Sequence, residues 1–140
     1  MIIIDGTELI LGRLASYAAK QLLLGENVHI INCEKVIDTG SKQQILKKYK
    51  RRMERGTPRK GPFMHRMPHR IVKRTVRGML PYKKARGKDA YKRLRCHIGI
   101  PEELQDKKTI SFKDAHLSKL PNVKYLDLKT ISHRIGAKIE

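Results

Sequence analysis

Apolar residues at the start of the chain recur with periods that predict a strand, a helix and a second strand. Ile2 to Ile4 is a short apolar run ended by Asp5-Gly6, which predicts a buried strand followed by a turn. In residues 11–22 leucines and alanines recur at helical spacing, and Gly25 follows at the expected C-terminal cap. Val28 to Ile31 predicts another strand. Because a helix connects the two strands, we expect them to be parallel, with a right-handed crossover.

A second amphipathic helix is predicted to begin at Ser41. Ser41 and Gln44 have the spacing of a capping box, and Ile45, Tyr49 and Met53 then recur every four residues. Together with the preceding pattern, this helix indicates an α/β protein. The length of 140 residues and the 39% hydrophobic content suit a single domain over residues 1–140.

Regular structure is predicted to stop at residues 56–68, where three prolines and two glycines occur in thirteen residues. Pro68 fits the first position of a further helix, in which Gly78 is expected to tolerate close packing and which Pro81 ends. The apolar stripe of that helix is Val72, Val76, Met79 and Leu80.

The pattern is less regular after this helix. A short helix is expected from about Lys88, leading into residues 96–100. Ile110 to Phe112 and Val123 to Leu126 are expected to be short strands or extended segments. Residues 128–135 predict a final helix that ends at Gly136.

Charge changes the interpretation of the middle of the chain. The net charge is +19, and residues 47–95 contain 20 of the 32 Lys and Arg but only two acidic residues. Few soluble enzymes have this balance, because a chain so basic repels itself unless a polyanion compensates it. The partner is therefore expected to be a nucleic acid or an anionic membrane.

Folded RNA fits the basic segment better than a membrane does. Membrane-surface helices carry Trp, Phe or Leu opposite their cations, whereas this chain has no Trp and only two Phe. No run of 18 apolar residues and no signal peptide is found, so a cytosolic location is expected. Cationic helices joined by a cationic loop suit RNA recognised by phosphate contacts and shape. Base stacking is the weaker interpretation, since few aromatic residues lie among the cations: Tyr49, Phe63, Tyr82 and Tyr91.

The sequence Asp38-Thr-Gly is typical of the catalytic loop of an aspartic protease. Such a site needs two carboxylates that share a proton in a mostly β protein. Here a basic helix follows at once, and nearby cations lower carboxylate pKa values. Asp38 is therefore expected to lie in a strand-to-helix turn, with Gly40 as the permissive residue.

Nucleotide and metal sites are not indicated. Neither G-x-x-x-x-G-K-[ST] nor G-x-G-x-x-G occurs. Cys33 and Cys96 have no C-x-x-C partner, and the six histidines have no ligand spacing with them, so no metal is expected. Cys33 is expected to be a buried, reduced hydrophobic residue.

Three motifs resemble the signatures of the large-subunit ribosomal protein L13 family. They are Gly12-Arg-Leu-Ala-Ser16, then Val28-x-x-x-Asn32-x-Glu34-Lys35-Val36 running to Thr39-Gly40, and Gly78-Met-Leu-Pro81. Their order and spacing also agree, over about residues 2–100, whereas the last forty residues match loosely. The short amino terminus and the lack of a long carboxy-terminal helical extension resemble the archaeal branch of the family, and Arg59-Lys-Gly-Pro62 is similar to archaeal and eukaryotic members. Cys33 stands where Ala is usual.

The resemblance implies a three-layer α/β/α fold around a small, mainly parallel four-stranded sheet, with the basic helices and loop added to it. Members of the family are structural constituents of the large ribosomal subunit in the cytoplasm. They bind its 23S-type rRNA early in assembly and have neither catalytic activity nor a required cofactor. A ribosomal protein of the L3 family is an expected neighbour, and no membrane or small-molecule substrate is implied.

RNA contacts are expected from cations of the basic segment and from one residue outside it. The alternatives are a free-standing RNA or DNA chaperone without a fixed site and, more distantly, the protease. The expected contacts are Arg13, Lys47, Lys48, Arg51, Arg52, Arg55, Arg59, Lys60, Arg66, Arg70, Arg74, Arg77, Lys83, Lys84, Arg86 and Lys88.

Overall fold

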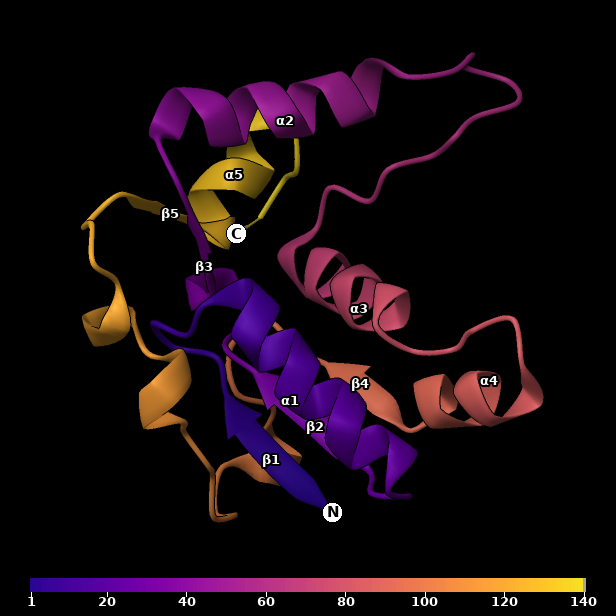
Figure 1. The fold of residues 1–140 in the computed structure, drawn as a ribbon, viewed down its shortest axis with the longest axis vertical. Coiled ribbons are helices and arrows are strands. Elements are labelled where there is room, and N and C mark those ends of the chain that lie inside the picture. The colour runs from indigo at the N-terminus through magenta and orange to yellow at the C-terminus, as the bar shows by residue number, and fades with distance from the viewer. Residues whose placement is uncertain (140) are drawn as a thin grey trace.

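The computed structural model describes residues 1–139 and confirms the α/β class (Figure 1). Its helices are α1 (Leu11–Leu23), α2 (Lys42–Glu54), α3 (Pro68–Gly78), α4 (Ala85–Lys92) and α5 (Leu128–Arg134). Its strands are β1 (Ile2–Asp5), β2 (Val28–Ile31), β3 (Ile37–Thr39), β4 (Leu94–Cys96) and β5 (Tyr125–Asp127). Short 3-10 turns lie at Cys33–Lys35, Glu102–Leu104, Lys113–Ala115 and Leu117–Lys119.

The strands form two separate sheets. β1, β2 and β4 are parallel, with Ile30 opposite Ile4 on one side and Cys96 on the other, which confirms the expected parallel pair. β3 instead pairs antiparallel with β5. The expected four-stranded sheet is therefore wrong in this detail. Asn32, at φ +53°, and the 3-10 turn after it redirect the chain, so that β3 leaves the first sheet.

The helices gather on one face of the parallel sheet. Ile4 and Ile30 are fully buried there, in a hydrophobic cluster with residues of α1, α2, α3 and α5. Ile3 and Ile31 point to the opposite face, where Leu104 completes a small separate cluster. The α/β/α prediction placed a layer of helices on this opposite face as well. Within residues 1–139 the structure has only the 3-10 turn Glu102–Leu104 there, because residues 97–110 cross the face without forming an α-helix.

Two capping predictions for the basic helices are confirmed. The hydroxyl of Ser41 accepts a hydrogen bond from the N–H of Gln44 at 3.4 Å, and Pro68 occupies the first turn of α3. The buried face of α2 is formed by Ile45 and Tyr49, as its period predicts. These anchors turn the remaining faces of α2 outward.

Two local predictions need correction, and in a third place the structure decides between two alternatives. α4 begins at Ala85, before the expected Lys88, and includes Gly87. A Cβ on Gly87 would lie 2.1 Å from the carbonyl oxygen of Pro81, so only glycine lets the first turn of the helix lie this close to the preceding turn. Residues 110–112, expected to be a short strand or an extended segment, form no strand, since only Ile110 makes a single bridge, to Ile4. Met79 is 41% exposed and lies outside the core.

Candidate nucleic-acid interface

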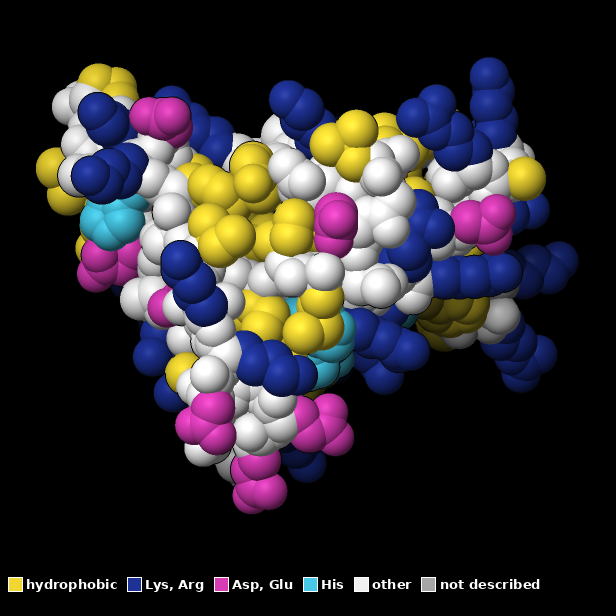
Figure 2. Space-filling view, turned by 90° about the horizontal axis from the view of Figure 1, so that it is seen from below, with side chains coloured by type: hydrophobic (Ala, Val, Ile, Leu, Met, Phe, Trp, Pro, Cys, Tyr) yellow, Lys and Arg dark blue, Asp and Glu magenta, His cyan; other side chains and the backbone are white. Residues whose placement is uncertain are grey.

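The basic segment forms one continuous part of the molecule, with its cations at the surface. In Figure 2, Lys and Arg side chains are densest toward the right of the view, while acidic side chains project from its lower edge. Two of the predicted contacts, Arg74 and Arg77, are half-buried and the others are exposed. The predicted contacts of the segment are distributed over its elements in chain order. Lys47, Lys48, Arg51 and Arg52 lie on α2; Arg55, Arg59, Lys60 and Arg66 follow it; Arg70, Arg74 and Arg77 lie on α3; Lys83 and Lys84 lie in the next turn; and Arg86 and Lys88 lie on α4.

Carboxylates neutralise very little of this charge. Among the predicted contacts, within residues 1–139, only Lys48 forms an ion pair, with Asp38 at 2.7 Å. Two other cations of the segment, Lys50 and Lys92, pair with acids on their own helices at 3.8 and 3.6 Å. A solvated helix face would normally mix signs along its length. The cations are therefore left available to an external polyanion.

The loop between α2 and α3 is held in place by backbone contacts. Thr57 and Gly61 exchange two hydrogen bonds, Thr57 N–H to Gly61 O at 3.3 Å and Gly61 N–H to Thr57 O at 2.9 Å. Nη1 of Arg74 donates to the carbonyl of Phe63 at 3.0 Å and so ties the loop to α3. The loop contains neither helix nor strand, as its composition predicts.

Aromatic residues of the segment mostly support the cations. The guanidinium of Arg77 lies 5.3 Å from the ring centre of Tyr82, and the ammonium of Lys73 lies 5.2 Å from that of Tyr91. Tyr49 is only 2% exposed, so its ring is not available to a nucleobase. Phe63, 67% exposed, is the most open aromatic ring among them. Phosphate contact thus remains the main expectation.

Histidines inside the segment are held neutral by their surroundings. Burial lowers the pKa of His65, and the charges of Arg70 and Arg74 lower it further. The pKa of His69 is also lowered, first by burial and then by Arg70. Near pH 7 the positive charge of the basic segment therefore comes from Lys and Arg.

Arg13 has different surroundings from the other predicted contacts. It is exposed in the first turn of α1, and its Nη1 donates to the carbonyl of Asp114 at 2.6 Å. This bond orients the guanidinium at the amino end of α1 and leaves its other N–H groups available. Arg13 is thus a cation outside the basic segment.

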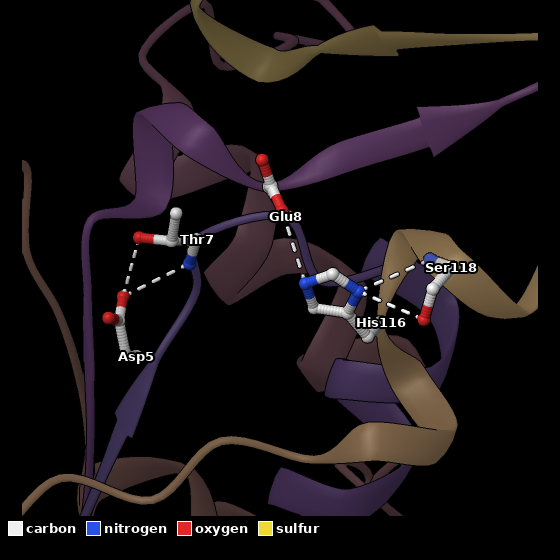
Figure 3. Close-up of polar contacts among 5 residues, drawn as sticks. All are labelled: Asp5, Thr7, Glu8, His116 and Ser118. Carbon is white, nitrogen blue, oxygen red and sulfur yellow. Dashed lines mark hydrogen bonds and ion pairs between the residues drawn. The ribbon is translucent and has the colours of Figure 1, made fainter.

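Polar contacts fix the turn between β1 and α1 (Figure 3). Oδ1 of Asp5 accepts hydrogen bonds from the N–H and the hydroxyl of Thr7 at 3.0 and 2.8 Å. The carboxylate of Glu8 lies 3.1 Å from Nε2 of His116, whose Nδ1 accepts from the N–H of Ser118 at 3.2 Å. Sequence patterns do not reveal this network, which holds the amino end of α1 against residues 113–119.

Neither a cluster of metal-ligating side chains nor a membrane-spanning helix is found in the part of the chain that the structure describes. Within residues 1–139, no three His, Cys, Asp or Glu side chains are grouped so that they could hold a metal ion. None of the helices in the same residues is both long enough and apolar enough to span a bilayer. Asp38 lies in β3 opposite Leu126, two residues before Gly40 at φ +131°, so it belongs to the end of the strand and the expected turn into α2 follows it.

Comparison with known proteins matches the sequence of this chain to one family. A family model described as ribosomal protein L13 matches residues 1–103. The large ribosomal subunit protein uL13 of Methanosarcina barkeri is 49% identical over 139 residues, which are 99% of each chain. The protein of that name from Archaeoglobus fulgidus is 47% identical and covers 96% of this chain and 86% of its own. The one from Methanococcoides burtonii is also 47% identical, over 99% of each chain. The chain belongs to the ribosomal protein L13 family.

Proposed function

We propose that this protein is a structural constituent of the large ribosomal subunit in the cytoplasm, that it binds the large-subunit rRNA through residues 47–95, and that it supports early subunit assembly. The observation that carries the proposal is the set of exposed cations without carboxylate partners on α2, α3, α4 and their connecting loops. Members of the L13 family are structural components and not enzymes.

The mechanism is electrostatic. Each Lys or Arg that neutralises a phosphate releases condensed counterions, which favours binding and makes it depend on salt. Because α2 and α3 are joined by an ordered cationic loop, their cations face phosphates from more than one direction. Such a surface can hold two RNA strands or helices together, which is the role that early assembly requires. We further propose that residues 1–140 form a single domain that presents this surface.

Salt dependence tests the RNA-binding mechanism. For about ten phosphate contacts, the affinity for a large-subunit rRNA fragment should fall on the order of 10⁵-fold between 50 and 200 mM salt. Replacing Arg51, Arg52 and Arg55 with Gln should reduce the slope of log K against log salt by about 2 to 3. Replacing Lys119 and Lys124, which lie outside the segment, should leave the slope nearly unchanged. An affinity that does not depend on salt would contradict the proposal.

Sedimentation of a cell lysate distinguishes a ribosomal constituent from a free-standing RNA chaperone. A constituent should travel almost wholly with large subunits at low salt and be released only under conditions that strip proteins from rRNA. A chaperone without a fixed site should spread across the gradient and remain mainly in the light fractions. Finding most of the protein in those fractions would overturn the ribosomal assignment.

Neighbouring ribosomal proteins, including one of the L3 family, are proposed as further partners. The support is the part of the surface outside the basic segment, where the apolar side chains of Ile98 and Ile100 are 38% and 47% exposed. Exposed apolar side chains of this kind are more typical of protein contacts than of phosphate contacts. Cross-linking within intact large subunits, followed by mass spectrometry, should join residues 98–110 to another protein. Cross-links only to RNA from these residues would contradict this part of the proposal.

A further inference from the structure

A half-enclosed groove of about 430 Å³ lies between α2, α3 and residues 62–64. Its lining includes three arginines, Arg52, Arg55 and Arg74, and an apolar group formed by Tyr49, Met64 and Ile71. Pockets that hold small organic ligands have volumes of about 300 to 1,000 Å³, so the groove is large enough for one nucleotide.

The positive charge of the groove favours an anionic ligand. None of its lining residues is acidic, and its arginines form no ion pair within residues 1–139. One guanidinium nitrogen of Arg74 is used to bind the carbonyl of Phe63 at 3.0 Å, which orients this side chain. Converging guanidinium groups repel one another, and a phosphate between them would relieve that repulsion through paired hydrogen bonds.

The apolar part of the lining distinguishes this groove from a simple phosphate site. Ile71 and Tyr49 are each only 2% exposed and form the packed base of the groove, while the half-buried Met64 and the exposed Pro62, from the loop that closes the groove, supply an accessible apolar wall. A phosphate gains nothing from such a wall. A nucleobase does, because its faces pack on apolar side chains and on guanidinium planes.

Gly78 gives independent support, because nothing inside the protein requires a glycine there. It lines the groove at the end of α3, its φ is not positive, and a Cβ built on it would meet no atom within 4 Å. Glycine is otherwise unfavourable in a helix. A glycine at position 78 is explained if a molecule from outside the protein approaches the backbone of α3 closely, because a side chain there would block it.

We propose that the groove between α2 and α3 receives one unpaired nucleotide of the RNA, with its phosphate at Arg52, Arg55 and Arg74 and its base against Met64 and Pro62. This inference rests on the proposed RNA-binding function and adds to it a site that reads an unpaired base. Recognition of the rRNA would then depend on a bulged or looped nucleotide as well as on phosphate positions.

Two RNA probes with the same number of phosphates test the site: one has every nucleotide paired except in a terminal loop, and the other has a bulged adenosine within the stem. Wild-type protein should bind the bulged probe about tenfold more tightly, because packing of one base contributes roughly 1 to 3 kcal/mol, or about 5- to 150-fold. Gly78→Leu should fill the groove without changing charge and should abolish this preference, while binding to the paired probe stays the same.

Matched variants separate the groove from the general cationic surface. Ala85→Leu adds the same side chain at an exposed position of α4 that does not line the groove, and it should keep the preference. Arg55→Gln should reduce the preference, whereas Lys84→Gln should weaken both probes equally. Circular dichroism should show that Gly78→Leu unfolds at a temperature no lower than wild type, so that loss of folding is excluded.

Each outcome of the experiment decides the inference. Equal binding of the two probes by wild type, or an intact preference in Gly78→Leu, overturns the nucleotide site and leaves the proposed function standing. Failure of wild type to bind either probe or the rRNA fragment overturns both proposals. Adenosine monophosphate serves as a third probe, because tight saturable binding of this free nucleotide, lost in Gly78→Leu, would reassign the groove to a soluble nucleotide and also overturn the inference.

Discussion

Nδ2 of Asn32 donates a hydrogen bond to Oδ1 of Asp5 at 2.9 Å and so joins the carboxyl ends of β1 and β2. Asn32 is 6% exposed and has a left-handed backbone, with φ +53°. Asn tolerates this backbone better than most residues do. The bond therefore fixes the point at which the chain leaves the parallel sheet.

Replacing Asn32 should destabilise the protein, and the size of the loss should depend on the replacement. Asn32→Ala removes a hydrogen bond to a charged group and places Ala in the left-handed region, which together should cost about 3 kcal/mol. Asn32→Gly loses the same bond but accepts the backbone, so it should cost about 1 kcal/mol less. Urea unfolding measures both values. Equal losses for the two variants would show that the backbone makes no contribution.

Acid should reduce stability partly through Asp5. Burial raises the pKa of Asp5, but hydrogen bonds from Asn32 and Thr7 more than offset this effect and hold it below its ordinary value. A depressed carboxyl pKa gives stability that is present above the pKa of the unfolded state, about 4, and is lost as pH falls through the folded-state pKa. Asn32→Ala should therefore flatten the pH dependence of unfolding below about pH 4. An unchanged slope in that variant would contradict the assignment.

Local patterns predict the elements that carry the function. Helical spacing, the Ser41 cap and Pro68 locate α1, α2 and α3, because apolar periodicity and capping act within a few residues. The basic segment can also be predicted from the sequence, since the density of Lys and Arg along the chain does not depend on the fold. The sixteen expected contacts remain predictions, because only RNA can show which of them meet phosphates.

Long-range pairings are what the sequence does not reveal. β3 pairs with β5, about ninety residues later, and no local pattern encodes that choice over joining the parallel sheet. The groove needs α2, α3 and the loop to be placed together by Tyr49, Ile71 and the bond from Arg74 to Phe63. The sequence predicts that Gly78 allows close packing, and only the fold shows that the space around this residue is open.

Asp38→Asn should have little effect on stability. The ion pair between Asp38 and Lys48 is partly exposed, with 43% of the lysine side chain accessible, so its loss should cost less than about 1 kcal/mol. Asn keeps the size and polarity of the Asp side chain, whereas Ala removes both, so Asp38→Ala should cost more. Thermal unfolding compares the two variants. Peptide cleavage by wild type that disappears in Asp38→Asn would revive the protease hypothesis.

The two free cysteines should react at different rates. Cys33 is fully buried, and both the neighbouring thiol of Cys96 and burial raise its pKa, whereas Cys96 is half-buried. Because the thiolate is the reactive form, iodoacetamide should alkylate Cys96 in the native protein and Cys33 only after unfolding. Peptide mass spectrometry distinguishes the sites, and Cys96→Ser should abolish the native reaction. Rapid native alkylation of Cys33 would contradict its buried position.

RNA affinity should increase as pH falls, through His65. In the free protein burial and neighbouring arginines lower the pKa of this exposed loop histidine, so it is neutral at pH 7. Phosphates bound beside it favour the imidazolium and raise its pKa, so binding takes up a proton between the two pKa values. Affinity for the rRNA fragment at constant salt should rise about three- to tenfold from pH 7.5 to 5.5, since one pKa unit corresponds to a tenfold change.

His65→Gln should remove most of this increase while binding like wild type at pH 7.5, where the histidine carries no charge. His133→Gln is the matched control, because that residue is also exposed but lies on α5, outside the basic segment. It should keep the pH dependence of wild type. The same rise in affinity for both variants would mean that groups other than His65 take up the proton, and a flat profile for wild type would place the loop away from the phosphates.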